Sequence, residues 1–346
     1  MPTYPTRTLT LDDATVATLD TYIETHAIDQ MYDHALVLGL LWNSAKEPGV
    51  VGPMLKLVNL AGKRRVQSQA GKNAVLPLAF AQTSPQYFRG TQTLSTAINP
   101  VITEALSIWS YLTHYAAISL TESVENTGPM AVLDIMKERI DEVYRSMSAQ
   151  LETDFWSTNT DIAAGTQDSL PGIQTYISTG PTTGTVWGLN RATYSWWRNN
   201  ADTVGSFAAN GLDKMRSMYY SCSSTNAVDP PTCIITTPTV LSYAVKQLEG
   251  IHRVTNDAIH SAELSTPVAS YMGIPVLQTS KVASGYMYFL NLNYLMLLTK
   301  KGVEWDVYDP PMPNDQLIAY QKRIVWGGTW GTSRPARHGV LSGITA

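Results

Sequence analysis

The sequence is poor in charged residues and in cysteine. Charged side chains make up 15% of its 346 residues, well below the roughly 25% of ordinary soluble domains. The formal net charge is −4, and this excludes a strongly basic nucleic-acid-binding protein, because neutralising phosphates needs a surplus of Lys and Arg. The two cysteines, Cys222 and Cys233, are too few for a disulfide scaffold and are typical of a reducing compartment.

Long hydrophobic segments are also missing. The longest apolar run, 35–42, is interrupted by Gly39 and is far shorter than the roughly 20 residues of a membrane-spanning helix. The first residues lack a basic start followed by an apolar core, so no signal peptide is predicted. We therefore expect a soluble intracellular protein with no membrane partner.

Aromatic and neutral polar residues take the place of charge. The chain has 18 Tyr and 9 Trp and is rich in Ser, Thr and Asn. The cores of protein interfaces are depleted in charge and enriched in aromatic residues. The composition therefore predicts that much of the exterior is covered by neutral, hydrogen-bonding partners, and it excludes a disordered chain or a coiled-coil rod.

Residues 1–54 are predicted to form an N-terminal arm without a core of its own. Arg7 is its only strong base in the first part, and the acidic residues there are Asp12, Asp13, Asp20, Glu24, Asp29 and Asp33. A short apolar helix and a loop with Pro and Gly follow. No stretch is long enough to enclose a core, so the arm must pack on something else.

Residues 55–115 contain short β-like runs separated by turns, which predicts a long extended β-hairpin. An isolated hairpin is barely stable in water, so this one needs an external partner. Its basic residues are Lys63, Arg64, Arg65, Lys72 and Arg89. A charged contact with a neighbouring subunit and a solvated hairpin tip remain equally open for them.

A long helix over 129–157 is the strongest local signal. Pro129 lies near its first turn, where proline is favoured. Apolar residues recur at a steady spacing of three and four, which is typical of one buried helix face: Leu133, Met136, Ile140, Val143, Met147, Leu151 and Phe155. At about 1.5 Å per residue the helix spans roughly 40 Å. We expect a spine helix laid across a β-sheet.

The remaining chain predicts two domains, one of them discontinuous. A linker rich in Thr and Gly precedes a mixed α/β segment, assigned to a domain over 166–302. In the last segment Ile318, Tyr320, Ile324 and Trp326 fall on one face of a strand. This strand needs a cover, and the spine helix is its expected partner. The second domain therefore combines 116–165 with 303–346.

No catalytic or metal-binding motif is present. The sequence lacks a nucleophile elbow, a zinc-protease motif, C-x-x-C and a phosphate-binding loop. His252 and His260 with the two cysteines match no zinc spacing. The pair Trp196-Trp197 suggests a sugar-stacking platform, but adjacent aromatics point in different directions, so core packing is the favoured reading. We expect no enzyme, cofactor or metal.

The order and spacing of segments over roughly 55–345 resemble the major capsid proteins of tailed bacteriophages with the Hong Kong 97-type fold. Residues 75–78, with Tyr87 and Gly90, resemble the extended hairpin of that family, the E-loop. Residues 118–126 resemble the entry to its spine helix. The other matching segments are 188–191, 194–199, 273–276, 284–285, 289–291, 321–330 and 339–341.

The resemblance implies an α+β fold with an N-terminal arm, an E-loop, a peripheral domain with the spine helix over a β-sheet, and a mixed α/β axial domain. It implies a major capsid protein that self-assembles as pentamers and hexamers into the icosahedral head shell around double-stranded DNA. Implied partners are a portal protein, a scaffolding protein, decoration or minor capsid proteins, and packaged DNA without sequence-specific contact.

Two departures and two alternatives accompany this resemblance. With about 60 residues before the hairpin, the chain lacks a long scaffolding segment, which suggests a separate scaffolding protein or none. Lys63, Lys72 and Asn314 show no spacing that identifies a crosslink. An encapsulin-like compartment shell is the nearest alternative, and a carbohydrate-binding protein or enzyme is the alternative from another class.

Overall fold

The computed structural model describes residues 66–81, 87, 89–91, 101–125, 129–158, 170–223, 229–251, 269–308 and 318–346. The predicted arm, the basic residues Lys63, Arg64 and Arg65, and Asn314 lie outside this part. Within it, no helix combines the length and the apolar composition needed to cross a membrane.

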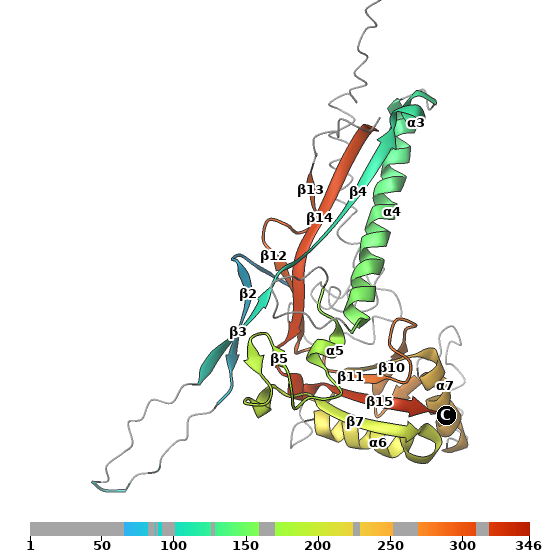
Figure 1. The fold of residues 1–346 in the computed structure, drawn as a ribbon. Coiled ribbons are helices and arrows are strands. Elements are labelled where there is room, and N and C mark those ends of the chain that lie inside the picture. The colour runs from blue at the N-terminus through green and yellow to red at the C-terminus, as the bar shows by residue number, and fades with distance from the viewer. Residues whose placement is uncertain are drawn as a thin grey trace, which may run out of the picture.

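A five-stranded sheet forms the elongated half of the molecule (Figure 1). β14 (Ile318–Thr332) is its long central strand, and β4 (Ser110–Ser119) runs antiparallel along one side of it. The other strands are β1 (Val66–Gln69), β12 (Leu295–Lys300) and β13 (Asp306–Tyr308).

The spine helix α4 (Pro129–Trp156) lies along β4. Six of the seven predicted stripe residues are buried: Met136, Ile140, Val143, Met147, Leu151 and Phe155. The side chain of the seventh, Leu133, lies outside the described part. The stripe shares one core with Ile118 of β4 and with Ile324 and Trp326 of β14. The helix therefore supplies the apolar cover that this face of the sheet needs.

A six-stranded sheet forms the other half. Its strands, in spatial order, are β7 (Asn200–Ser206), β15 (Gly339–Thr345), β11 (Met287–Leu290), β8 (Cys233–Thr236), β10 (Ile274–Gln278) and β9 (Ala269–Tyr271). Every residue of β8 and β11 is buried, as expected for strands covered on both faces. The helices α6 (Phe207–Cys222) and α7 (Pro238–Ile251) pack against this sheet.

Smaller elements complete the fold. The antiparallel pair β2 (Asn73–Ala79) and β3 (Ile102–Ile108) projects from the body, as Figure 1 shows. Beside this pair lie β5 (Thr185–Val186), β6 (Leu189–Asn190) and the short helix η2 (Ser195–Trp197). The remaining short helices are α3 (Leu120–Glu125), α5 (Ile173–Tyr176) and η4 (Pro335–Arg337).

Strand pairing departs from the predicted segment boundaries in four places. β1, expected in the hairpin, pairs with β12 in the five-stranded sheet. β15 falls within 303–346 but pairs in the six-stranded sheet, whereas β12 falls within 166–302 but pairs with β14. The first half of β4, expected in the hairpin, also pairs with β14. Alternation in a sequence indicates which face of a strand is apolar but not which strand it pairs with. The division into named domains stays a prediction.

Candidate functional site

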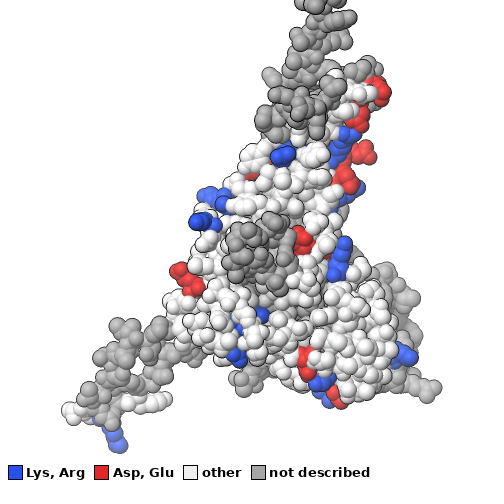
Figure 2. Space-filling model, in the orientation of Figure 1, with Lys and Arg blue, Asp and Glu red and all other residues white. Residues whose placement is uncertain are grey.

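Of the two described members of the predicted basic set, one lies just before the projecting hairpin and the other lies within it. Lys72 is exposed in the turn between β1 and β2, and Arg89 is exposed in the connection from β2 to β3. Their role as contacts with another subunit stays a prediction. Figure 2 shows that charge is sparse on this face of the molecule and that both signs alternate along α4.

The exposed face of β3 carries an apolar-acidic-apolar stripe, which the hairpin prediction did not identify. Ile102 is 71% and Leu106 is 44% exposed, and the exposed Glu104 lies between them. Ala105 on the opposite face is fully buried. The alternation was visible in the sequence, but it did not tell which of the two faces would stay uncovered.

Aromatic packing holds the hairpin strands against the short elements β5, β6 and η2. Phe80 stacks on Trp196 with ring centroids 5.5 Å apart and an interplanar angle of 16°. The backbone N–H of Leu106 donates to the Trp187 carbonyl at 3.0 Å. Trp197 is 1% exposed and its indole N–H donates to the Val186 carbonyl. The Trp pair considered as a sugar platform is thus used for packing.

The face of the five-stranded sheet opposite α4 carries a row of exposed residues on three neighbouring strands. Arg323 of β14 lies between Tyr115 of β4 and Tyr308 of β13 in the strand register. Arg323 is exposed, and the two tyrosines are 53% and 46% exposed. Directly paired residues point to the same face of a sheet, so these three side chains form one surface, here termed the tyrosine row.

A second aromatic contact extends this surface. Tyr111 is 53% exposed, and the Lys300 ammonium lies 5.0 Å from its ring centroid and bonds its hydroxyl. The ring covers Gly327, where a Cβ would lie 3.1 Å from ring carbons. A side chain at that position would therefore push the tyrosine away. Because Gly327 has no side chain, the Tyr111 ring can lie close against the sheet at this position.

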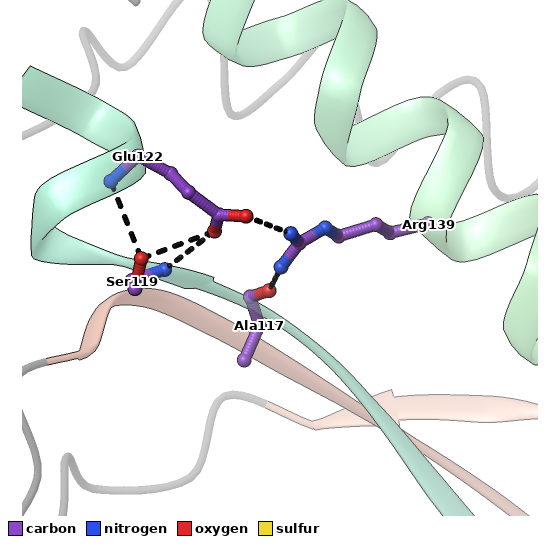
Figure 3. A network of polar contacts seen from close by, with 4 residues as sticks. All are labelled: Ala117, Ser119, Glu122 and Arg139. Carbon is purple, nitrogen blue, oxygen red and sulfur yellow. Dashed lines mark hydrogen bonds and ion pairs between the residues drawn. The ribbon is translucent and has the colours of Figure 1, made fainter. Parts of the chain in front are cut away.

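The corner between the sheet and the spine helix is closed by a polar network (Figure 3). Glu122 accepts hydrogen bonds from the backbone N–H and the hydroxyl of Ser119, both at 3.1 Å, and its own N–H donates to that hydroxyl at 3.2 Å. This reciprocal pattern is a capping box for α3. Arg139 of α4 bonds both the Glu122 carboxylate and the Ala117 carbonyl.

The network also sets the protonation of Glu122. The hydrogen bond from the Ser119 backbone, followed by those from its hydroxyl and by the Arg139 charge, holds the pKa of Glu122 below its ordinary value. Desolvation opposes this shift. The carboxylate is therefore ionised at neutral pH, and it links the end of β4, the start of α3 and the spine helix.

The described side chains form no recognisable reaction centre. No group of three His, Cys, Asp or Glu residues in that part could hold a metal ion. Cys222 and Cys233 are buried, and His252 and His260 lie outside the described residues. The features described above are exposed surfaces, namely the β3 stripe and the tyrosine row, and the polar network around Glu122.

Comparison with solved structures gives the fold. The chain superposes on the cyanophage A-1(L) capsid asymmetric unit with a TM-score of 0.59 at 19% identity, over 85% of this chain and 93% of that chain. On the capsid of the native GTA particle it superposes with a TM-score of 0.52 at 13% identity, over 87% of this chain and 93% of that chain. On the SrpI encapsulin of Synechococcus elongatus PCC 7942 the TM-score is 0.51 at 11% identity, over 87% of this chain and 90% of that chain.

No family model and no curated protein matches the sequence. At these identities the structural likeness defines the fold, and it covers most of the chain. The α+β fold of the Hong Kong 97-type capsid proteins, expected from the sequence resemblance, is confirmed.

Proposed function

We propose that this chain is the major capsid protein of a tailed bacteriophage, and that many copies form the icosahedral head shell around its double-stranded DNA. Its role is structural rather than catalytic. The observation that carries the proposal is the likeness to the cyanophage capsid asymmetric unit over 85% of this chain and 93% of that chain. Pentamers and hexamers, a portal protein, a separate scaffolding protein and decoration proteins are the expected partners, with assembly in the host cytoplasm and the virion as the final location.

Two exposed surfaces of the chain fit each other as parts of different copies. The β3 stripe offers Ile102 and Leu106 on either side of the Glu104 carboxylate. The tyrosine row offers two rings on either side of the Arg323 guanidinium. An ion pair at the centre with aliphatic side chains against the flanking rings would bury both sets.

These surfaces stand on separate parts of one subunit, the stripe on the projecting hairpin and the row on the five-stranded sheet (Figure 1). Contact between them therefore joins one copy to the next in a head-to-tail manner. Such a heterologous contact generates a ring when the rotation closes. Rings of this kind are what a shell built from pentamers and hexamers requires.

A charge swap tests this contact. Glu104→Arg and Arg323→Glu each place like charges opposite one another, which disfavours association. We expect each single variant to raise the protein concentration needed for assembly by about tenfold or more, equivalent to about 1.4 kcal/mol. The double variant restores an opposite pair and should recover assembly.

Arg216→Glu is the matched control, because Arg216 is also exposed but lies on α6 of the other sheet. Sedimentation and electron microscopy of purified protein measure the particles. Wild-type assembly by both single variants would refute this contact, while leaving the shell proposal intact. A wild-type chain that stays monomeric or dimeric, even with a scaffolding protein co-expressed, would refute the shell itself.

An encapsulin-like compartment is the second candidate, favoured by the likeness to the SrpI encapsulin. Both candidates predict closed shells, so the contents of the shell distinguish them. We expect particles isolated from infected cells to contain double-stranded DNA. We also expect genes for a portal protein and a terminase beside the gene for this chain. Shells filled with a single enzyme, beside a gene for that enzyme, would favour the compartment.

A further inference from the structure

His338 occupies the joint between the two large sheets and is fully buried. It lies in the segment that leads from β14 of the five-stranded sheet to β15 of the six-stranded sheet. The connection from β11 to β12 crosses between the same sheets in the opposite direction, and Asn291 begins it. The backbone N–H of Ser333 donates to the Tyr294 carbonyl at 2.9 Å, so the two crossings are in direct contact.

The imidazole ring bonds both crossings at once. Its Nδ1 lies 3.2 Å from the backbone nitrogen of Asn291, and its Nε2 lies 2.9 Å from the hydroxyl of Thr332 at the end of β14. The amide N–H of Asn291 is a donor, so Nδ1 must be the acceptor and carries no proton. Nε2 then carries the proton of the neutral ring and donates it to Thr332.

A proton on Nδ1 would place two N–H groups against each other and put a charge in a fully buried site. Burial lowers the pKa of His338 to about 3. Among the described residues, no carboxylate is bonded to the ring. The charged and titratable groups on the surrounding elements are Arg334 before η4 and Arg337 at its end, Asp229 and Tyr294 near Asn291, and Cys222 of α6.

These neighbours are already engaged with each other. The Tyr294 hydroxyl donates to the Asp229 carboxylate at 2.7 Å, and the Arg334 guanidinium lies 5.3 Å from the Tyr294 ring centroid. Arg337 donates to the Cys222 carbonyl at 3.3 Å.

We propose that His338 is an acid-sensitive latch between the two sheets. The neutral ring holds both crossings together, and uptake of a proton at Nδ1 breaks the bond to Asn291 and releases the joint. This property belongs to the single chain and goes beyond its assembly into a shell. Acid would thus weaken the contact between the two crossings at this point.

Linkage gives the size of the effect. The folded state holds His338 neutral far below the ordinary value of about 6.5. Its contribution is complete above about pH 6.5 and is lost progressively as the pH falls toward the folded-state value. Each pH unit below about 6.5 therefore favours the opened joint by about tenfold.

Cys222 reports on the opening, because its thiol is fully buried beside the joint. A Cβ built on Gly339 would lie 2.7 Å from its sulfur. The unassembled full-length chain is treated with dithiodipyridine, and mass spectrometry of peptides separates labelling at Cys222 from labelling at Cys233. Rates are divided by those of glutathione at the same pH, between about pH 7 and about pH 5.

The corrected rate at Cys222 should rise about tenfold per pH unit below about pH 6.5 in the wild type. His338→Gln keeps an acceptor and a donor but does not titrate, so its rate should stay constant. His114→Gln is the matched control and should behave like the wild type. A constant rate in the wild type, or an equal slope in His338→Gln, would overturn the proposal.

If His338→Gln does not fold, hydrogen exchange of the wild type tests the latch instead. The protection of the Asn291 amide, corrected for intrinsic exchange, should fall by the same tenfold per pH unit. Unchanged protection would overturn the latch. Either result is independent of whether the chain forms shells.

Discussion

Ile140 lies near the middle of the spine helix and is completely buried between α4 and the five-stranded sheet. Ile140→Ala removes three side-chain carbons from this core. At about 0.8 kcal/mol for each buried carbon, the lost transfer free energy is about 2.4 kcal/mol. The remaining cavity adds to this, so we expect the free energy of unfolding to fall by about 3 kcal/mol, within the range of about 2–5 for such substitutions.

Urea unfolding of the unassembled chain, followed by tryptophan fluorescence, measures this loss. Glu138→Ala is the control, because Glu138 is exposed on the same helix and should change stability by less than about 0.5 kcal/mol. Ile140→Asp places an unpaired charge in the apolar stripe and should abolish soluble assembly. Equal stabilities of Ile140→Ala and Glu138→Ala would refute the packing argument, and normal particles from Ile140→Asp would refute the helix orientation.

Two further changes test the packing and the corner network. Gly331→Ala would put a Cβ 2.6 Å from the Trp187 ring, so we expect a loss of about 1–3 kcal/mol in urea unfolding. Gly180→Ala, with open space around it, should have no comparable effect, and equal behaviour of the two would contradict the clash. The lowered pKa of Glu122 means that its ionised form stabilises the fold above its ordinary pKa, and this contribution is lost as the pH falls through the folded-state pKa. Glu122→Gln should therefore weaken the dependence of the unfolding midpoint on acid pH, and an unchanged dependence would contradict this role.

The spine helix was predictable because its evidence is local. An apolar residue every three or four positions is sufficient to define the buried face, and the structure buries Met136, Ile140 and Val143 on it. The end of the helix differs by one residue from the predicted 129–157. The resemblance to a capsid family also relied on segment order, which the sequence displays directly.

The tyrosine row was not predictable, because it depends on which strands are neighbours. Tyr115, Tyr308 and Arg323 come from three segments far apart in the sequence, and only the register of β4, β13 and β14 sets them side by side. The Trp196-Trp197 pair posed a related problem. Its composition suggests a ligand platform, whereas in the structure Trp196 stacks on Phe80 at the end of β2.

The sequence by itself determined the scarcity of charge, the spine helix and the absence of recognised catalytic motifs, because composition, helical period and motif spacing are properties of the chain alone. Only the tertiary structure showed that β15 and β12 each pair outside the domain predicted for their segment. It also showed that His338 is buried where the connections leading to these two strands meet. A single histidine carries no periodic signal. Its chemistry depends on burial and on two hydrogen-bond partners, Asn291 and Thr332, which the sheet topology brings to it.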